Sequence, residues 1–427
     1  MNINDSLEKL FSLHNFGIKL GIDNIKNFLF LLNNPHLKLK TIHIAGSNGK
    51  GSSSAFIASI LQEHKFKIGL YTSPHFIRFN ERIKINGNEI DDQYISEFIS
   101  KHFEYIIKNQ ITFFEATTAL AFCFFRDQKV DFAVIETGLG GRLDATNVLN
   151  PLCSVITGIS LEHTHILGKT IKQIAEEKAG IIKRNSKVIT APLLNSANQV
   201  MKLKCKKMKS ELIEVSKYIS KKKDSVTLTL GKDKLEIRDL PLAGNYQNLN
   251  AALASLTVYH LLNNFNKDFF ENGLMNVIKN TSLSGRYEYF NSKPDVIFDS
   301  AHNPDGVRKF LKEFRRNKKK YNNKYLLFSV LKDKSVKNML KSLRKEFDKI
   351  FLTTINFERV ASLKDLKNIC KEFNFEIKIV NDRIGFIHKM LKGSKNDCLV
   401  VLGSMYLIGQ VKKELLKNKL DISFEKM

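Results

Sequence analysis

The sequence predicts an α/β protein of two domains, each organised around a parallel sheet. The first observation is a strand, a glycine-rich turn and a helix over Thr41–Leu61. The second is the nearly all-apolar run Asp131–Ile135, typical of a strand buried on both faces of a parallel sheet. The third is an alternation of strand and helix patterns from Asp295 onward. A chain of 427 residues is long enough for two separate cores.

The first domain is expected over residues 1–284 and the second over 285–427. Helices are expected at Tyr246–Leu262 and Lys267–Lys279, ahead of a linker at Gly285, and a β-hairpin at Ser225–Arg238. The second domain reads as a doubly wound, Rossmann-like α/β unit. It has no G-x-G-x-x-G signature, so neither NAD nor flavin is expected.

The glycine-rich turn, Ala45-Gly-Ser-Asn-Gly-Lys-Gly-Ser52, has the features of a phosphate-binding loop. Backbone N–H groups and the dipole of the following helix would face an anion, and Lys50 would add a point charge. The spacing departs from the common P-loop, because Gly51 stands between Lys50 and Ser52. The alternative is an ordinary tight turn, but the flanking strand and helix patterns favour a P-loop ATPase-like domain.

Composition narrows the function classes. The net charge of +25 comes mostly from widely spread lysines, which indicates a solvated basic surface rather than a nucleic-acid site. No strip interleaves arginine with aromatic residues. The five cysteines lack C-x-x-C spacing, which argues for a reducing compartment and against a zinc cluster. With no signal pattern and no apolar run of about 18 residues, a cytoplasmic protein without a membrane span is expected.

Candidate metal ligands follow the predicted strands. Glu136 ends the run Asp131–Ile135 and precedes a glycine-rich loop, and His163 follows the strand Cys153–Thr157. Ligands in α/β sheets bind beyond the carboxyl ends of strands, so two neighbouring strands would each present a ligand for Mg²⁺. Ser73 lies in a polar loop and could offer a hydroxyl. Alone, Glu136 could also be a capping residue and Ser73 a turn residue.

Two further charged residues have both a structural and a functional interpretation. Glu115 lies in the first turn of an apolar helix, where the helix dipole favours an anion, yet its neighbours Phe113 and Phe114 would solvate it poorly. Lys178 could be a surface ion-pair partner. If buried with a lowered pKa, it could instead react with CO₂ to form a carbamate.

The motifs together resemble the dihydrofolate synthase/folylpolyglutamate synthase family, a branch of the Mur ligase superfamily. The resemblance runs in family order over nearly the whole chain. It is carried by the segments His43–Ser52, Tyr71–His75, Glu136–Asn147, Glu162–Thr164, Glu177–Gly180, Gln247–Ala252, Ser284–Tyr287, Phe298–Pro304 and Leu402–Ser404. Departures are mild: Ser47 replaces a usual Thr, Glu162 a common Asp and Ser300 a common Val.

The resemblance implies a role for each matching position. ATP would be bound by Asn48, Gly49, Lys50, Gly51, Ser52, Asn250, Arg286 and Asp299, with His302 near that site. Two Mg²⁺ ions would be held with the help of Ser73, Glu136, His163 and a carbamylated Lys178. Ser12, Leu13, His14, Asn15, Glu115 and Leu143 would line a pterin site. His14, from spacing alone, is more simply a surface histidine, and Asn15 fits the pterin segment less well.

The implied activity is ATP-dependent ligation of L-glutamate to dihydropteroate and to folates through an acyl phosphate. The retained Leu13-His14 pair and Glu115 favour both activities over a monofunctional folylpolyglutamate synthase. Another Mur-type ligase, such as a cell-wall enzyme, would need a nucleotide-sugar-binding domain before the P-loop, where only a short segment stands. A non-enzymatic ATP- or nucleic-acid-binding protein would not need Lys50, Glu136, His163 and Lys178 together. A monomer is expected, with domain closure excluding water from the acyl phosphate.

Overall fold

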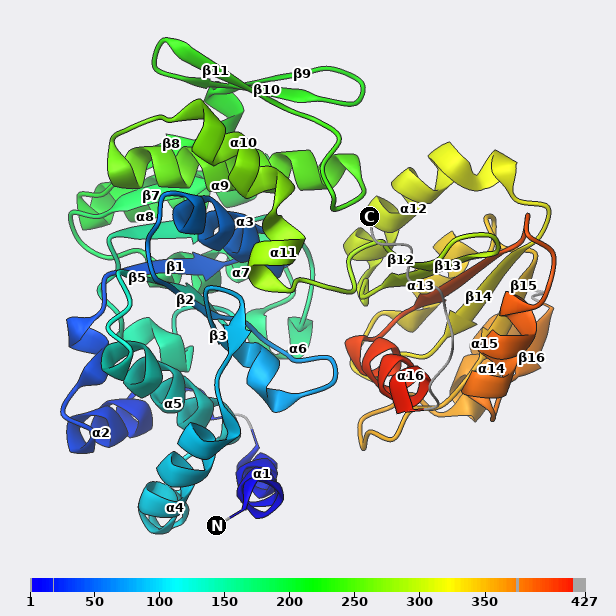
Figure 1. The fold of residues 1–427 in the computed structure, drawn as a ribbon, viewed down its shortest axis with the longest axis horizontal. Helices are drawn as coiled ribbons and strands as arrows, with labels where there is room; N and C mark the ends of the chain where they lie inside the picture. Colours follow the sequence, from blue (N-terminus) through cyan, green and yellow to red (C-terminus); the bar gives the residue numbers. More distant parts are fainter. Residues whose placement is uncertain (1, 18, 374–375, 418–427) are drawn as a thin grey trace. The chain divides into compact units, whose positions relative to one another are not determined.

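The computed structural model describes residues 2–17, 19–373 and 376–417 and divides into two compact units (Figure 1). Unit 1 consists of Met1–Pro241 and Gln247–Leu283, and unit 2 of Leu242–Tyr246 and Ser284–Met427. The segment Leu242–Tyr246 therefore groups with the second unit, which a single boundary at 284–285 does not describe. Each unit is built on its own large sheet, which is mostly parallel.

Unit 1 is built on an eight-stranded sheet with the order β4-β3-β2-β5-β1-β6-β7-β8. The six strands from β2 to β8 in this order are parallel, and β3 and β4 form an antiparallel edge. The strands are β1 (Thr41–Ala45), β2 (Ile68–Tyr71), β3 (Ile83–Ile85), β4 (Asn88–Glu89), β5 (Phe132–Glu136), β6 (Cys153–Ile156), β7 (Lys187–Thr190) and β8 (Glu211–Glu214).

Helices cover both faces of this sheet (Figure 1). They are α1 (Ile3–Ser12), α2 (Asp23–Leu31), α3 (Lys50–Glu63), α4 (Asp92–Lys108), α5 (Phe113–Asp127), α6 (Thr164–Leu167), α7 (Ile171–Lys178), α8 (Asn195–Met208), α9 (Asn245–Leu262), α10 (Lys267–Met275) and α11 (Val277–Thr281). One core joins α1, α2, α4 and α5 to strands β2 and β5, and another joins α7 and α8 to β6 and β7.

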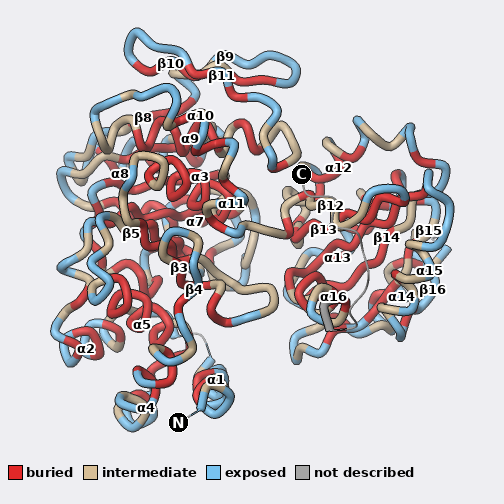
Figure 2. The backbone as a smooth tube through the Cα atoms, in the orientation of Figure 1, coloured by how far each residue is buried: buried red, intermediate tan, exposed pale blue. Residues whose placement is uncertain are grey.

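Helix α3 is buried along nearly its whole length, as Figure 2 shows together with β5. It packs closely on α10, where Ser59 Oγ donates a 2.6 Å hydrogen bond to Gly273 O. A Cβ at Gly273 would lie 2.5 Å from Ile60 Cα, so the close approach of these helices needs a glycine. Because α3 is clamped between the sheet and α10, its first turn is a rigid platform for the preceding loop.

Of two expectations for the last part of unit 1, one is confirmed and the other is wrong. The β-hairpin is confirmed: β10 (Val226–Leu230) pairs antiparallel with β11 (Asp233–Ile237), and β9 (Ile219–Lys221) completes a three-stranded sheet. The single helix expected over Lys267–Lys279 is wrong. It is broken at Asn276, which caps the end of α10 and the start of α11 and donates from Nδ2 to Glu63 Oε1 at 3.1 Å.

Unit 2 contains a six-stranded sheet with the order β12-β13-β17-β14-β15-β16, parallel except for the edge strand β12. Its strands are β12 (Glu288–Asn291), β13 (Asp295–Asp299), β14 (Lys324–Phe328), β15 (Lys349–Leu352), β16 (Ile377–Ile379) and β17 (Cys398–Leu402). Its helices are α12 (Pro304–Asn317), α13 (Val336–Leu343), α14 (Leu363–Glu372), α15 (Arg383–Leu391) and α16 (Met405–Lys417). The α/β architecture predicted for both domains is confirmed.

None of the helices within the described ranges is both long enough and apolar enough to cross a membrane.

Candidate active site

The glycine-rich turn joins the buried strand β1 to the N-terminus of α3. Gly49 is the N-cap of α3 with φ +95°, a conformation that residues with a Cβ rarely adopt. A Cβ at Gly49 would also lie 2.7 Å from Asn250 Oδ1, and one at Gly46 would overlap Thr157 Oγ1. The backbone N–H groups and the dipole at this helix end suit an anion such as a nucleotide phosphate.

Replacing Gly49 by alanine is expected to weaken ADP binding and to cost about 1–3 kcal/mol of unfolding free energy, because the left-handed backbone is strained. Gly231→Ala is the matched control: Gly231 has φ +63° in the β10–β11 turn, and a Cβ there would lie 3.0 Å from Tyr259 Oη. Calorimetric titration with ADP should show weakened binding for Gly49→Ala and wild-type affinity for Gly231→Ala. Equal affinities for both variants would contradict the expectation that the turn at Gly49 binds nucleotide phosphates.

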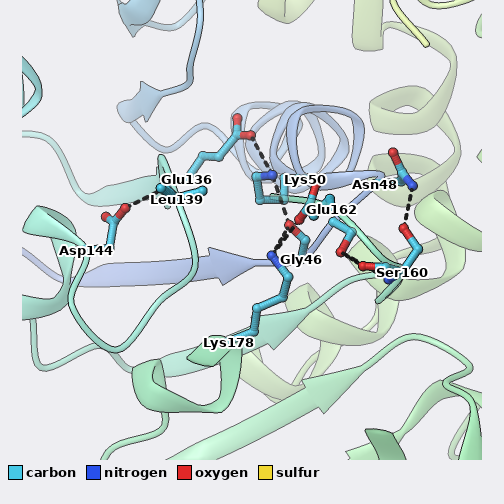
Figure 3. Close-up of polar contacts among 10 residues, drawn as sticks. Gly46, Asn48, Lys50, Glu136, Leu139, Asp144, Ser160, Glu162 and Lys178 are labelled. Atoms are coloured by element: carbon cyan, nitrogen blue, oxygen red, sulfur yellow. Dashed lines mark hydrogen bonds and ion pairs between the residues drawn. The ribbon is translucent and has the colours of Figure 1, made fainter. Parts of the chain in front are cut away.

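Lys50 points back over the turn toward the end of β5 (Figure 3). Its Nζ donates a 2.9 Å hydrogen bond to Gly46 O and lies 3.9 Å from Glu136 Oε1. Glu136 is the last residue of β5 and only 4% exposed. β5 is the direct neighbour of β1, with Ile44 opposite Glu136. The structure thus brings the predicted phosphate-binding cation and the predicted metal-binding carboxylate together. Gly51 and Ser52 are buried in the first turn of α3.

Lys178 is buried, so its interpretation as a surface ion-pair partner is wrong. Its Nζ donates to Gly46 O at 2.9 Å and to Glu162 Oε1 at 2.8 Å, and Figure 3 shows it converging with Lys50 on the same carbonyl. Burial lowers the pKa of the Lys178 amine, although the Glu162 carboxylate opposes this shift. Burial alone would raise the pKa of Glu162, but the nearby Lys178 and Lys50 cations lower it to about 2.

His163 differs from its expected position. β6 ends at Ile156, and His163 lies further along the chain as the half-buried N-cap of α6, with φ +45°. The strands that lead to Glu136 and His163 are not neighbours either, because β1 runs between β5 and β6. Strands consecutive in the chain need not pair in a doubly wound sheet. The two chain segments therefore leave the sheet on either side of the P-loop strand.

Ser73 follows β2 in a half-buried loop and precedes a cis bond to Pro74. Among the described residues, no group of three or more His, Cys, Asp or Glu side chains is placed to hold a metal ion. Mg²⁺ typically takes one or two protein carboxylates together with nucleotide phosphates and water. A single carboxylate beside the phosphate-binding turn, as at Glu136, fits that demand.

The predicted ATP contacts of unit 1 include two asparagines held by other side chains. Asn48 Nδ2 donates to Ser160 Oγ at 3.2 Å. Asn250 Nδ2 donates to Gln247 Oε1 at 2.8 Å, which directs its Oδ1 toward Gly49. Both amide groups therefore have a defined orientation beside the turn. Gln247 and Ser160 were not among the residues predicted from the sequence.

The N-terminal segment predicted for the pterin site lies against the start of α5. Ser12 ends α1, Leu13 is buried, and His14 and Asn15 are exposed in the 3₁₀ turn Leu13–Phe16. The His14 ring stacks on Phe113, with 4.2 Å between ring centroids and 24° between the ring planes. These two rings, from distant parts of the sequence, form an aromatic platform.

Glu115 and Leu143 have different surroundings. Glu115 is buried and completes a capping box: its Oε2 accepts hydrogen bonds from Thr112 N at 2.8 Å and Thr112 Oγ1 at 2.7 Å. The structural interpretation of Glu115, as an N-terminal charge of α5, thus has direct geometric support, and the capping box adds to it. Leu143 is half-buried in the loop that follows β5.

A buried polar chain beneath this loop was missed from the sequence. His43 Nε2 lies 2.8 Å from Thr146 Oγ1, and that hydroxyl donates to Asp144 Oδ1. Asp144 also accepts a 2.8 Å hydrogen bond from Leu139 N, which braces the loop after Glu136. Burial, with a smaller contribution from Lys183, lowers the pKa of His43 to about 3, so the imidazole is neutral. The sequence signal that could have revealed this chain of contacts is the presence of a histidine, His43, within the mostly apolar strand β1.

The predicted nucleotide contacts of unit 2 gather at the carboxyl end of β13. Asp299 accepts hydrogen bonds from Tyr287 N and Ala301 N, both at 2.8 Å. Burial raises the pKa of Asp299 to about 6, although these bonds and the charge of Arg286 oppose it. His302 Nδ1 lies 2.9 Å from Ser300 O. Arg286, Asp299 and His302 are thus parts of one local structure in unit 2.

Comparisons with known proteins match both domains of the chain. Residues 44–258 match the Mur ligase middle domain, and residues 285–405 match the Mur ligase glutamate ligase domain. The dihydrofolate synthase/folylpolyglutamate synthase of Bacillus subtilis (strain 168) is 36% identical over 422 residues, covering 94% of this chain and 96% of the relative.

Solved structures agree over the whole chain. The folylpolyglutamate synthase of Thermotoga maritima has a TM-score of 0.83 and 30% identity, with 98% of each chain covered. E. coli FolC in complex with DHPP and ADP has a TM-score of 0.86 and 25% identity, covering 98% of this chain and 99% of that one. With both Mur ligase domains matched in order and relatives aligned end to end, the chain belongs to the dihydrofolate synthase/folylpolyglutamate synthase family of Mur ligases.

Proposed function

We propose that this protein ligates L-glutamate to dihydropteroate, giving dihydrofolate, and to the γ-carboxylate of folyl-glutamates, with ATP as the energy source. The observation that carries the proposal is the position of Lys50 at the N-terminus of α3, 3.9 Å from the Glu136 carboxylate. A cation and a helix N-terminus suit the phosphates of a nucleoside triphosphate, and an acid at a strand end suits its metal ion.

The reaction proceeds in two steps. A substrate carboxylate oxygen attacks the γ-phosphorus of ATP, the bond to ADP breaks, and an acyl phosphate forms. The amine of glutamate then attacks the acyl carbon, loses a proton, and expels inorganic phosphate from a tetrahedral intermediate. Phosphoryl transfer depends on positioning and charge neutralisation. The Lys50 ammonium, which donates to Gly46 O in this structure, would donate instead to the phosphates, hold them in place and neutralise part of their charge.

Ser73, Glu136 and His163 are proposed to hold Mg²⁺, which when bound neutralises phosphate charge. Lys178 is proposed to react with CO₂ and carry a carbamate that helps to hold a second ion. The buried, pKa-lowered amine of Lys178 supports this, because the neutral amine is the reactive form. Asn48, Gly49, Asn250, Arg286 and Asp299 are proposed as ATP contacts, with His302 beside them.

The His14–Phe113 platform is proposed to receive the flat pterin ring. The pterin would stack on the outside of this pair, as the two side-chain rings stack on each other. Ser12, Leu13, Asn15, Glu115 and Leu143 would surround it. We further propose that the enzyme works as a cytoplasmic monomer on small molecules, without nucleic acid or membrane. Its lysines are spread rather than gathered with aromatic residues, which supports a function without nucleic acid.

The test is product formation with ATP, Mg²⁺ and glutamate, followed by mass spectrometry. Dihydropteroate should give dihydrofolate, and tetrahydrofolate monoglutamate should give the diglutamate, each with one ADP per bond formed. If tetrahydrofolate monoglutamate gives product and dihydropteroate does not, the enzyme is a monofunctional folylpolyglutamate synthase and the proposed dihydrofolate synthase activity is wrong. No glutamate-dependent product from either substrate would overturn the proposed function.

A further inference from the structure

The P-loop is tied to the loop after β6 by reciprocal hydrogen bonds between two serines. Ser47 Oγ donates to Ser160 O at 3.0 Å, and Ser160 N donates to Ser47 Oγ at 3.0 Å. The backbone adds two more contacts, because the N–H groups of Ser47 and Asn48 donate to Gly158 O at 2.7 and 3.3 Å. These bonds fix the backbone of Gly158–Ser160 against the phosphate-binding turn.

The Ser160 side chain makes a separate contact. Its Oγ accepts the 3.2 Å hydrogen bond from Asn48 Nδ2, and Figure 3 shows the two side chains facing each other beside the turn. The backbone of Ser160 is already held by Ser47. Its hydroxyl is therefore available to orient the Asn48 amide, which precedes the helix N-cap Gly49.

The chain continues from Ser160 directly to Glu162 and His163. Glu162 ion-pairs with the buried Lys178 at 2.8 Å, which fixes the far end of this short segment. The segment from Gly158 to Glu162 is thus anchored at both ends, once to the phosphate-binding turn and once to α7. The Asn48 side chain therefore hydrogen-bonds, at Ser160, to a segment that is itself held at both ends.

We propose that Ser160 is a positioning residue for ATP: its hydroxyl holds the Asn48 amide in the orientation that meets a phosphate and couples it to the segment that carries His163. This inference rests on the proposed function, since it takes Asn48 as an ATP contact. Ser160 itself acts through Asn48 and not on the reacting atoms.

The test compares Ser160→Ala, Ser160→Thr, Asn48→Ala and the double variant Asn48→Ala/Ser160→Ala. Loss of one neutral hydrogen bond should raise the Kd for ADP and the KM for ATP about fivefold in Ser160→Ala, with kcat changed less than about twofold. Ser160→Thr, which keeps a hydroxyl, should restore both constants. In the Asn48→Ala background, Ser160→Ala should have no further effect, because the interaction is already absent.

Ser186→Ala is the matched control. Ser186 is likewise half-buried, and its Oγ donates a 2.8 Å hydrogen bond to Lys183 O, before the start of β7. This control should keep wild-type ADP affinity, and thermal unfolding should show that all the variants are folded.

Wild-type ADP affinity in Ser160→Ala, or an equal effect of that substitution with and without Asn48, would overturn the inference. ADP affinity is measured without folate or glutamate. A wild-type protein that binds ADP yet makes no folate product would therefore overturn the proposed function and leave the Ser160 comparison valid.

Discussion

Replacing Lys50 by methionine is expected to lower kcat about 10²- to 10³-fold, the effect typical of removing one preorganised charge from a developing anion. Methionine keeps the length of the side chain but loses the ammonium group. That group lies between Gly46 O and Glu136 Oε1, and no other lysine of α3 can replace it, since α3 contains a single lysine. Steady-state ADP formation with dihydropteroate and glutamate measures the loss.

Two comparisons make this result specific. Lys206→Met removes an exposed lysine from α8 and should leave kcat and the circular dichroism spectrum unchanged. Lys50→Arg keeps the charge but presents a planar fork where a point charge is needed, so it should recover only part of the rate. A kcat of Lys50→Met within about fivefold of wild type would exclude Lys50 from phosphoryl transfer.

Replacing Glu162 by glutamine is expected to cost about 3 kcal/mol of unfolding free energy at neutral pH. The two side chains of the Glu162–Lys178 pair are 8% and 2% exposed. In protein kept free of metal and CO₂, where Lys178 is an ammonium and not a carbamate, the neutral amide would leave this buried cation without its counter-charge. The pKa of Glu162 is lowered from 4.5 to about 2 in the folded protein. Its contribution is therefore fully present above the unfolded pKa and is lost as pH falls through the folded pKa.

Urea unfolding between pH 7 and pH 3 should thus show a stability difference between wild type and Glu162→Gln that is constant above about pH 5.5 and shrinks below pH 4.5. Glu177→Gln is the matched control. Glu177 pairs with Arg142, whose side chain is 57% exposed, so its loss should cost less than about 1 kcal/mol. A pH-independent difference, or equal costs for both variants, would show that the Glu162–Lys178 pair does not stabilise the fold.

Local patterns predicted most elements because their signals are strong. The run from Phe132 to Ile135 is apolar since β5 is buried between two helix layers, and the β10–β11 turn is marked by Gly231. Two of the elements that were not predicted, β12 and α15, lack such signals. β12 is an edge strand with every residue only half-buried, and α15 buries Ile387 alone, so neither shows a clear apolar period.

Sheet order was the main error of the sequence analysis. The strands before Glu136 and His163 are successive in the chain, which suggested neighbours, but β1 lies between them. Strand pairing over long sequence separations depends on the packing of whole helices, such as α3 and α7, which no local pattern encodes. The observed order matters for function, because β1, which leads to the glycine-rich turn, lies between the strands that lead to Glu136 and His163.

The residues of the candidate site also differ in whether a local sequence pattern could reveal them. Lys50 and Glu136 could be proposed from the sequence because a glycine-rich turn marks the first and the end of an apolar strand marks the second. Ser160, His43 and Thr146 make their contacts only in the folded protein. Ser160 lies outside every motif, and the motifs that contain His43 and Thr146 do not show that these two side chains meet. Their partners come from segments about 100 residues apart in the sequence, so only the fold could show them.

The central claim is that the turn between β1 and α3 holds ATP and its metal ion. The most direct measurement is a crystal structure with a non-hydrolysable ATP analogue and Mn²⁺, located by its anomalous scattering. The account predicts phosphates at the N-terminus of α3 against Lys50 Nζ, and manganese bound to those phosphates with Glu136 and His163 as ligands. Phosphates bound elsewhere, or manganese out of reach of both side chains, would contradict it.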